Sequence, residues 1–288
     1  MIALLGLSSA LVYGASDFLG GVASRRITPL LVSFISQLVA LLIVAIATLV
    51  SNPQWSTSVF VLGAVAGVAG ALGTWAFYAS LAIGPMSVVS PGVAMIYAVV
   101  PAIVGFALGE RIAVPGFVAL AAVVVAAVLI AVPRQRDTAR LTPRAMVLGS
   151  IAGLGFAGYI IAIDRTPNDS GLAPLLVDLV VATVLYGGVL LANRVRRGPV
   201  EGPTEWAGIR DRSGVVQSVF TGVLLGAGSI LLVIGLHLGQ LAVMGVLNAL
   251  YPLGTVILAY FVLKERLSVL QTVGIVLALA ASALLALV

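Results

Sequence analysis

The sequence contains no cysteine and a single histidine, and only 9% of its 288 residues are charged. The missing cysteines exclude disulfides, thiolate metal ligands and cysteine nucleophiles, and one histidine cannot build a histidine-based metal site. The scarcity of charge matters more, because a water-soluble domain with 61% hydrophobic residues would have too little polar surface to face its solvent. We therefore predict that lipid surrounds most of the chain, and we expect no metal and no cofactor.

Ten apolar runs divide the chain. A bilayer core is about 30 Å thick, and a helix of about 20 apolar residues crosses it with its backbone hydrogen bonds satisfied. The connections are short, so no separate soluble domain fits between the runs. We predict an all-α integral membrane protein with ten transmembrane helices; nine helices, or a re-entrant segment, is the alternative. The predicted helices are 2–22, 29–50, 59–82, 88–108, 114–132, 145–163, 172–192, 215–237, 243–263 and 269–288.

The basic residues lie on one side of these helices. Of the 15 lysines and arginines, all but Arg111 and Arg165 follow the first, fifth, seventh or ninth run. The positive-inside rule then places those connections in the cytoplasm and both termini outside the cell membrane. Because topology explains the net charge of +5, we expect a lipid bilayer and a small molecule as partners, and no nucleic acid.

Two parts of the chain resemble each other. The tetrapeptide Pro-Leu-Leu-Val occurs at 29–32 and again at 174–177, and the runs 88–108 and 243–263 are each followed by a Glu-Arg pair. The second correspondence also aligns three glycines of each half. Since each copy holds five helices, an odd number, the second copy enters the membrane upside down, as in many transporters. We therefore predict one membrane domain around a central cavity. It consists of a first repeat 1–132, a cytoplasmic linker 133–144 and a second repeat 145–288.

Further residues point to a known family. Tyr13-Gly14 in the first run is matched by Phe156-Ala157 in the sixth, and Tyr251-Pro252 lies in the ninth. With five plus five short helices and the repeated Glu-Arg ends, the whole chain resembles the EamA-like transporters of the drug/metabolite transporter superfamily. The resemblance implies a ten-helix bundle that exports amino acids, other small metabolites or toxic compounds. One departure is the uncharged connection 51–58, which is often strongly basic in the family.

Two acids lie inside apolar runs. Asp17 shares a helix face with Tyr13, one turn earlier. An ionised acid at the bilayer centre costs about 2.5 to 3.5 kcal/mol, so Asp17 should face the bundle interior. We predict that it binds a substrate amine or a proton; the alternative is an interfacial aspartate paired with Arg25 or Arg26. Asp178, which has no basic neighbour within one turn, is the second candidate.

Aromatic side chains form the other candidate surface. Their ring faces can hold an ammonium group by cation–π contact at about 0.5 to 2 kcal/mol each. Trp75 and Tyr78 are three residues apart on one helix face, and Asn248 adds a directional hydrogen-bonding group one turn before Tyr251. Ordinary packing is the alternative for the rings. The predicted cavity residues of this group are Trp75, Tyr78, Tyr97, Tyr159, Asn248 and Tyr251.

Prolines and glutamates mark the helix ends and bends. Pro91, Pro101 and Pro252 each remove an internal hydrogen bond and can kink a helix. We predict that they form a gate, although packing alone would also explain them. Glu110 and Glu265 are predicted to cap or anchor the helix ends that they follow.

The sequence has no Gly-x-x-x-x-Gly-Lys-Ser/Thr loop for ATP, so movement must be passive or driven by an ion gradient. We predict a secondary transporter that exports small metabolites, such as amino acids or amine-bearing or aromatic compounds, by alternating access of a central cavity. A translocator of lipids or lipid-linked precursors is the alternative. An intramembrane enzyme fits less well, because two separated aspartates and one histidine form no catalytic cluster. Proton coupling, and a monomer or a homodimer, stay open.

Overall fold

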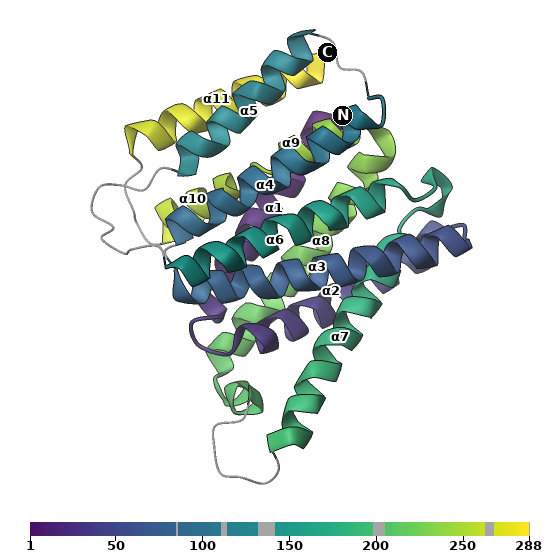
Figure 1. Cartoon of the computed structure of the whole chain (residues 1–288), viewed down its shortest axis with the longest axis vertical. Helices are drawn as coiled ribbons and strands as arrows, with labels where there is room; N and C mark the ends of the chain where they lie inside the picture. The colour runs from purple at the N-terminus through teal and green to yellow at the C-terminus, as the bar shows by residue number, and fades with distance from the viewer. Residues whose placement is uncertain (85, 111–113, 132–141, 198–204, 263–267, 288) are drawn as a thin grey trace.

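The computed structural model describes residues 1–84, 86–110, 114–131, 142–197, 205–262 and 268–287. Within these ranges the chain is helical, and Figure 1 shows the helices packed side by side as one bundle. The helices are α1 (Ile2–Ala23), α2 (Pro29–Ser51), α3 (Thr57–Ile83), α4 (Met86–Ala107), α5 (Val114–Ala131), α6 (Pro143–Asp164), η1 (Asn168–Ser170), α7 (Ala173–Arg197), η2 (Glu205–Arg210), α8 (Arg212–Leu238), α9 (Leu241–Asn248), α10 (Tyr251–Val262) and α11 (Val269–Leu287).

The prediction of an all-helical protein is confirmed for the described residues. Each predicted run coincides with a helix, except that the ninth is divided into α9 and α10; its end, and the ends of the fifth and tenth runs, lie outside the described residues. Six helices are long and apolar enough to cross a membrane, namely α1, α2, α3, α6, α7 and α8. The described apolar stretches of α4, α5, α11 and the α9–α10 pair are shorter.

Two helices begin with the same sequence signal. Thr28 precedes Pro29 at the start of α2, and Thr142 precedes Pro143 at the start of α6. Each threonine hydroxyl accepts a hydrogen bond from a backbone N–H three residues later, at 3.4 Å and 3.2 Å. The proline then occupies a first-turn position whose N–H would have no partner. Both helices therefore start at points that the sequence itself defines.

Helices far apart in the sequence are neighbours in the bundle. The helix α1 packs against α8, and α6 packs against α3; likewise α2 packs against α8, and α7 against α3. The helices α5 and α11 pack together as an outer layer, and the two ends of the chain lie at the same end of the bundle (Figure 1). Each of these five pairs joins a helix of the first half of the chain to a helix of the second half.

Glycines let these helices approach closely. A Cβ atom at Gly67 of α3 would lie 2.7 Å from the carbonyl oxygen of Asp178 in α7, and one at Gly222 of α8 would lie 2.5 Å from the carbonyl oxygen of Ser36 in α2. A larger residue would push the backbones apart. In these two contacts Asp178 and Ser36 take equivalent places. The Pro-Leu-Leu-Val alignment instead pairs Asp178 with Ser33, one turn earlier than Ser36.

The outer surface is apolar while polar side chains lie inside. On α2, Leu42, Ile46 and Leu49 are 59%, 66% and 81% exposed, whereas Gln37 on the same helix is 4% exposed. A water-soluble bundle would have the opposite distribution. The exposed apolar faces fit contact with lipid chains, so the multi-pass membrane protein predicted from composition agrees with the fold.

Candidate functional site

A pocket lies at the centre of the bundle, between helices of both halves. The space between its atoms is ≈ 700 Å³, its open part included. Its lining residues are Tyr13, Asp17, Gln37, Gly70, Thr74, Phe77, Tyr78, Tyr97, Phe156, Tyr159, Asp178, Leu179, Leu225, Ser229, Leu232, Asn248 and Tyr251. Eight of the nine residues predicted to line a cavity are therefore together, with Trp75 as the exception.

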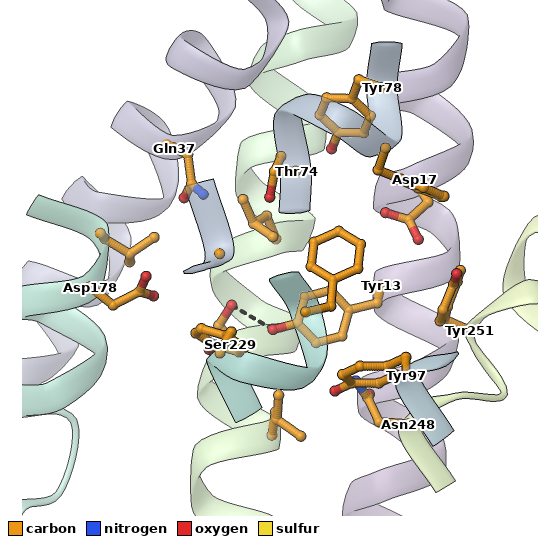
Figure 2. Close-up of a pocket in the computed structure, with 17 residues that line it drawn as sticks. Tyr13, Asp17, Gln37, Thr74, Tyr78, Tyr97, Asp178, Ser229, Asn248 and Tyr251 are labelled. Atoms are coloured by element: carbon orange, nitrogen blue, oxygen red, sulfur yellow. Dashed lines mark hydrogen bonds between the residues drawn. The ribbon is translucent and has the colours of Figure 1, made fainter. Parts of the chain in front are cut away.

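The two predicted acids lie on opposite sides of this pocket. Asp17 projects from α1 and Asp178 from α7, as Figure 2 shows. Asp178 is 4% exposed, and within the described residues neither carboxylate has a hydrogen-bond or ion-pair partner. Asp17 therefore does not pair with Arg25 or Arg26, which was the alternative considered for it. The bundle holds both acids in its interior without a counter-charge.

Aromatic rings form the pocket wall between the acids. The ring of Phe77 meets those of Phe156 and Tyr251 edge to face, with centroids 5.8 Å and 6.1 Å apart, and Tyr97 meets Phe156 in the same way at 6.4 Å. Edge-to-face contacts fix the ring orientations. The pocket therefore has a rigid wall that can contact an apolar or aromatic group.

Two polar residues of the pocket, Tyr97 and Asn248, are hydrogen-bonded to each other and, through Asn248, to Ser9 behind them. Ser9 donates to the side-chain oxygen of Asn248 at 2.9 Å, and the Asn248 amide donates to the Tyr97 hydroxyl at 2.8 Å. We call Ser9, Tyr97 and Asn248 the bonded cluster. It ties α1, α4 and α9 together, so the predicted role of Asn248 as a directional group is already used within the protein.

Other polar groups in the pocket have no partner. The side-chain oxygen of Gln37 and the hydroxyl of Tyr159 are buried, and neither makes a hydrogen bond among the described residues. We call these two residues, with Asp17 and Asp178, the open groups. A buried polar atom without a partner costs about 1 to 3 kcal/mol. The open groups are hence the part of the pocket that is ready for a ligand.

Trp75 does not line the pocket, which contradicts its prediction. It is 39% exposed on the outer surface of α3. The pocket face of α3 is formed by Gly70, Thr74, Phe77 and Tyr78. A helix turns by about 100° per residue, so Trp75 is rotated outward from Thr74. The apolar sequence of α3 gave no signal for which of its faces is buried.

The three prolines predicted to form a gate differ in their positions. The side chain of Pro91 lies outside the described residues. Pro101 is buried in α4, where a Cβ at Gly245 of α9 would lie 3.1 Å from it, so it packs against the facing helix. Pro252 is the second residue of α10, a position that needs no N–H. The ninth run is interrupted between Asn248 and Tyr251, one turn before Pro252, where a proline leaves the Asn248 carbonyl without its helical N–H partner. Whether this interruption acts as a gate stays a prediction.

Glu110 caps a helix of the other half. Its carboxylate accepts hydrogen bonds from the backbone N–H groups of Leu241 and Ala242 at 2.9 Å and 3.0 Å. These groups begin α9, so Glu110 is a cap, but of a helix in the other half and not of the helix end that it follows. Glu265 lies outside the described residues. Away from the pocket, Asp164 and Arg165 form an ion pair of 2.7 Å.

Several lining residues are not among those predicted from the sequence. Gln37 is an amide inside an apolar run, and that fact alone could have singled it out. Thr74 and Ser229 directly follow a pair of glycines that the internal repeat aligns, so the repeat could have found them; Ser229 shares a hydrogen bond of 2.7 Å with the Tyr13 hydroxyl (Figure 2). Phe77 carries no signal beyond its hydrophobicity.

Comparisons with known proteins agree with this architecture. The model of the EamA-like transporter family matches residues 143–287, just over half of the chain. A solved structure titled only as the crystal structure of a protein is similar in fold, with a TM-score of 0.71 and 17% sequence identity, covering 99% of this chain and 96% of that one. No curated protein matches the chain.

Proposed function

Because the chain belongs to the EamA-like transporter family, within the drug/metabolite transporter superfamily, we propose that it is a secondary transporter that exports small metabolites by alternating access of its central pocket. The proposed substrates are amino acids and amine-bearing or aromatic compounds. The observation that carries the proposal is the central pocket itself, with its buried open groups and its aromatic wall.

The proposed arrangement of the chain is two inverted five-helix repeats, 1–132 and 145–288, that cross the membrane ten times. Matched contacts support it. Gly73 of α3 lies against Phe156 of α6, and Gly228 of α8 lies against Tyr13 of α1. The residues matched by the family model, 143–287, nearly coincide with the second repeat. Repeats of this kind place the substrate site between the halves.

The proposed orientation in the cell membrane has both termini outside. It rests on the distribution of arginine and lysine among the connections. Two exposed positions at opposite ends of the bundle test it: Thr57→Cys, at the start of α3, should react with an impermeant thiol reagent on whole cells, and Ser213→Cys, at the start of α8, should not. Since the chain has no cysteine of its own, the reversed result would invert the topology.

Transport itself is tested with the purified full chain in vesicles. We expect flux of radiolabelled phenylalanine, or of small amines, that depends on the protein and exceeds the leak of empty vesicles. Repeating the assay with and without a proton gradient shows whether protons are coupled. Flux of fluorescent lipids between leaflets, with no movement of any small solute, would favour the lipid translocator instead.

A further inference from the structure

The central pocket presents two acidic groups and nothing basic to balance them. Its lining residues, which are all among those described, include no lysine, arginine or histidine. Building on the proposed transport function, we propose that the pocket binds a diamine with an apolar or aromatic spacer, with one ammonium group at Asp17 and the other at Asp178.

Charge balance favours a dication over the other substrate classes. Charges buried in an apolar interior are found paired, because an unpaired one is costly. A monoamine would pair with one aspartate and leave the other alone. An amino acid would add a third carboxylate to a pocket that has no basic group to receive it. A diammonium ligand pairs with both Asp17 and Asp178.

The unpartnered acceptors on one side of the pocket supply further bonds. An ammonium group has three N–H donors. A single carboxylate oxygen does not accept all three, so further acceptors are needed. The side-chain oxygen of Gln37, on a residue 4% exposed, and the hydroxyl of Tyr159 have no hydrogen-bond partner in the described residues. Both line the pocket with Asp178, and Figure 2 shows Gln37 and Asp178 on the same side. These are acceptors that an ammonium at Asp178 can use.

Gly70 leaves the Asp178 carboxylate open to the pocket. A Cβ atom at Gly70 would lie 3.5 Å from Oδ1 of Asp178 and 3.4 Å from Cδ2 of Tyr159. Both distances are ordinary van der Waals contacts, so the space in front of the carboxylate is the size of a methyl or ammonium group. An ammonium can therefore reach Asp178 because this position has no side chain.

The spacer of the diamine would cross the aromatic part of the pocket. Figure 2 shows the Tyr13 ring between the two aspartates, and Phe77 and Phe156 line the same space. Ring faces bind methylene chains and aromatic groups by apolar contact, and they add cation–π attraction to the ammonium ends. A spacer without hydroxyl or carboxyl groups suits this wall.

Titration calorimetry on the purified full chain tests the proposal. The ligands are putrescine, cadaverine, hexamethylenediamine and p-xylylenediamine, with butylamine, benzylamine and phenylalanine as matched compounds. A hydrogen-bonded charge pair is worth about tenfold in affinity, so the best diamine should bind about tenfold tighter than its monoamine. In the Asp17→Asn and Asp178→Asn variants, the affinity for the diamine should fall to that for the monoamine.

Two further variants separate binding from folding. Gly70→Ala fills the space before Asp178 without a backbone clash and should weaken the diamine several-fold while the protein stays folded. Asp169→Asn changes an exposed acid outside the pocket and should bind diamines as the parent does. Failure of every diamine to bind, equal affinity for diamine and monoamine, or parental affinity in either Asn variant would overturn the proposal.

Flux measurements in vesicles distinguish this proposal from the transport function. Export of phenylalanine or benzylamine with no movement or binding of any diamine would refute the diamine site and leave the transporter intact. Tight diamine binding that both Asn variants weaken, with no solute crossing the membrane, would refute transport and leave the binding site.

Discussion

Tyr97 and Asn248 of the bonded cluster line the same pocket as the open groups, but of these two sets only the bonded cluster makes side-chain hydrogen bonds within the described part of the chain. The side chains of the bonded cluster satisfy one another and join α1, α4 and α9. Of the open groups, Gln37, Tyr159 and Asp178 are buried as well, but their side-chain oxygens make no hydrogen bond among the described residues. Polar residues inside this membrane protein thus divide by their hydrogen-bond partners: some join helices, and we propose that the others bind the ligand.

The largest expected effect is on stability, at the bonded cluster. Asn248→Ala removes two hydrogen bonds and leaves the Tyr97 hydroxyl without its donor. The unsatisfied Tyr97 hydroxyl costs about 1 to 3 kcal/mol, and the cavity left by the missing side chain adds to it, so we expect a loss of about 2 to 5 kcal/mol, measured by thermal unfolding in detergent. The exposed Asn168→Ala is the control, and equal melting temperatures for the two variants would remove the structural role of the cluster.

A pair of glycine variants extends the comparison to the backbone. A Cβ at Gly155 of α6 would lie 2.7 Å from Cα of Gly73 in α3, so Gly155→Ala should cost about 1 to 3 kcal/mol through overpacking. Gly70→Ala should leave stability nearly unchanged and impair ligand binding. Gly188→Ala, with nothing within 4 Å of the new Cβ, is the helix-propensity control. If Gly70→Ala destabilised the protein as much as Gly155→Ala, the open side of the pocket would be packed rather than free.

The smallest expected effect on stability comes from Gln37→Leu. The Gln37 oxygen has no partner to lose, so the melting temperature should stay the same or rise. Ligand affinity should fall about two- to tenfold, the value of one neutral hydrogen bond. Gln217→Leu is a matched control, because its side-chain oxygen is also unpartnered in the described residues but lies outside the pocket. Equal affinity losses in both variants would contradict a direct contact of Gln37 with the ligand.

Hydropathy predicts where the helices run because the bilayer fixes their length, and each predicted run coincides with helix. It does not predict which side of a helix faces the pocket. The helix α3 is apolar throughout, so Trp75 and Tyr78 looked equivalent in sequence although one is outside and the other inside. Acids within apolar runs are the better signal: charge is costly in lipid, and both Asp17 and Asp178 lie in the interior as expected.

Contacts between distant segments account for the rest of the site. Gln37 and Ser229 belong to helices of different halves, and only the folded bundle brings them to one pocket. The interruption of the ninth run does have a local signal, because Pro252 has no N–H to bond to the carbonyl of Asn248, the last residue of α9.

The cap formed by Glu110 has a consequence for how the chain is made. The helix α9 has 8 residues, too few to be stable alone, and two of its first N–H groups are satisfied only by the Glu110 carboxylate. Glu110 is synthesised more than a hundred residues earlier, so its carboxylate is already present when the ribosome delivers residues 241–248. We therefore expect this short helix to form only after the first half of the chain is in place, which delayed protection of the Leu241 and Ala242 amides in a Glu110→Gln variant would test.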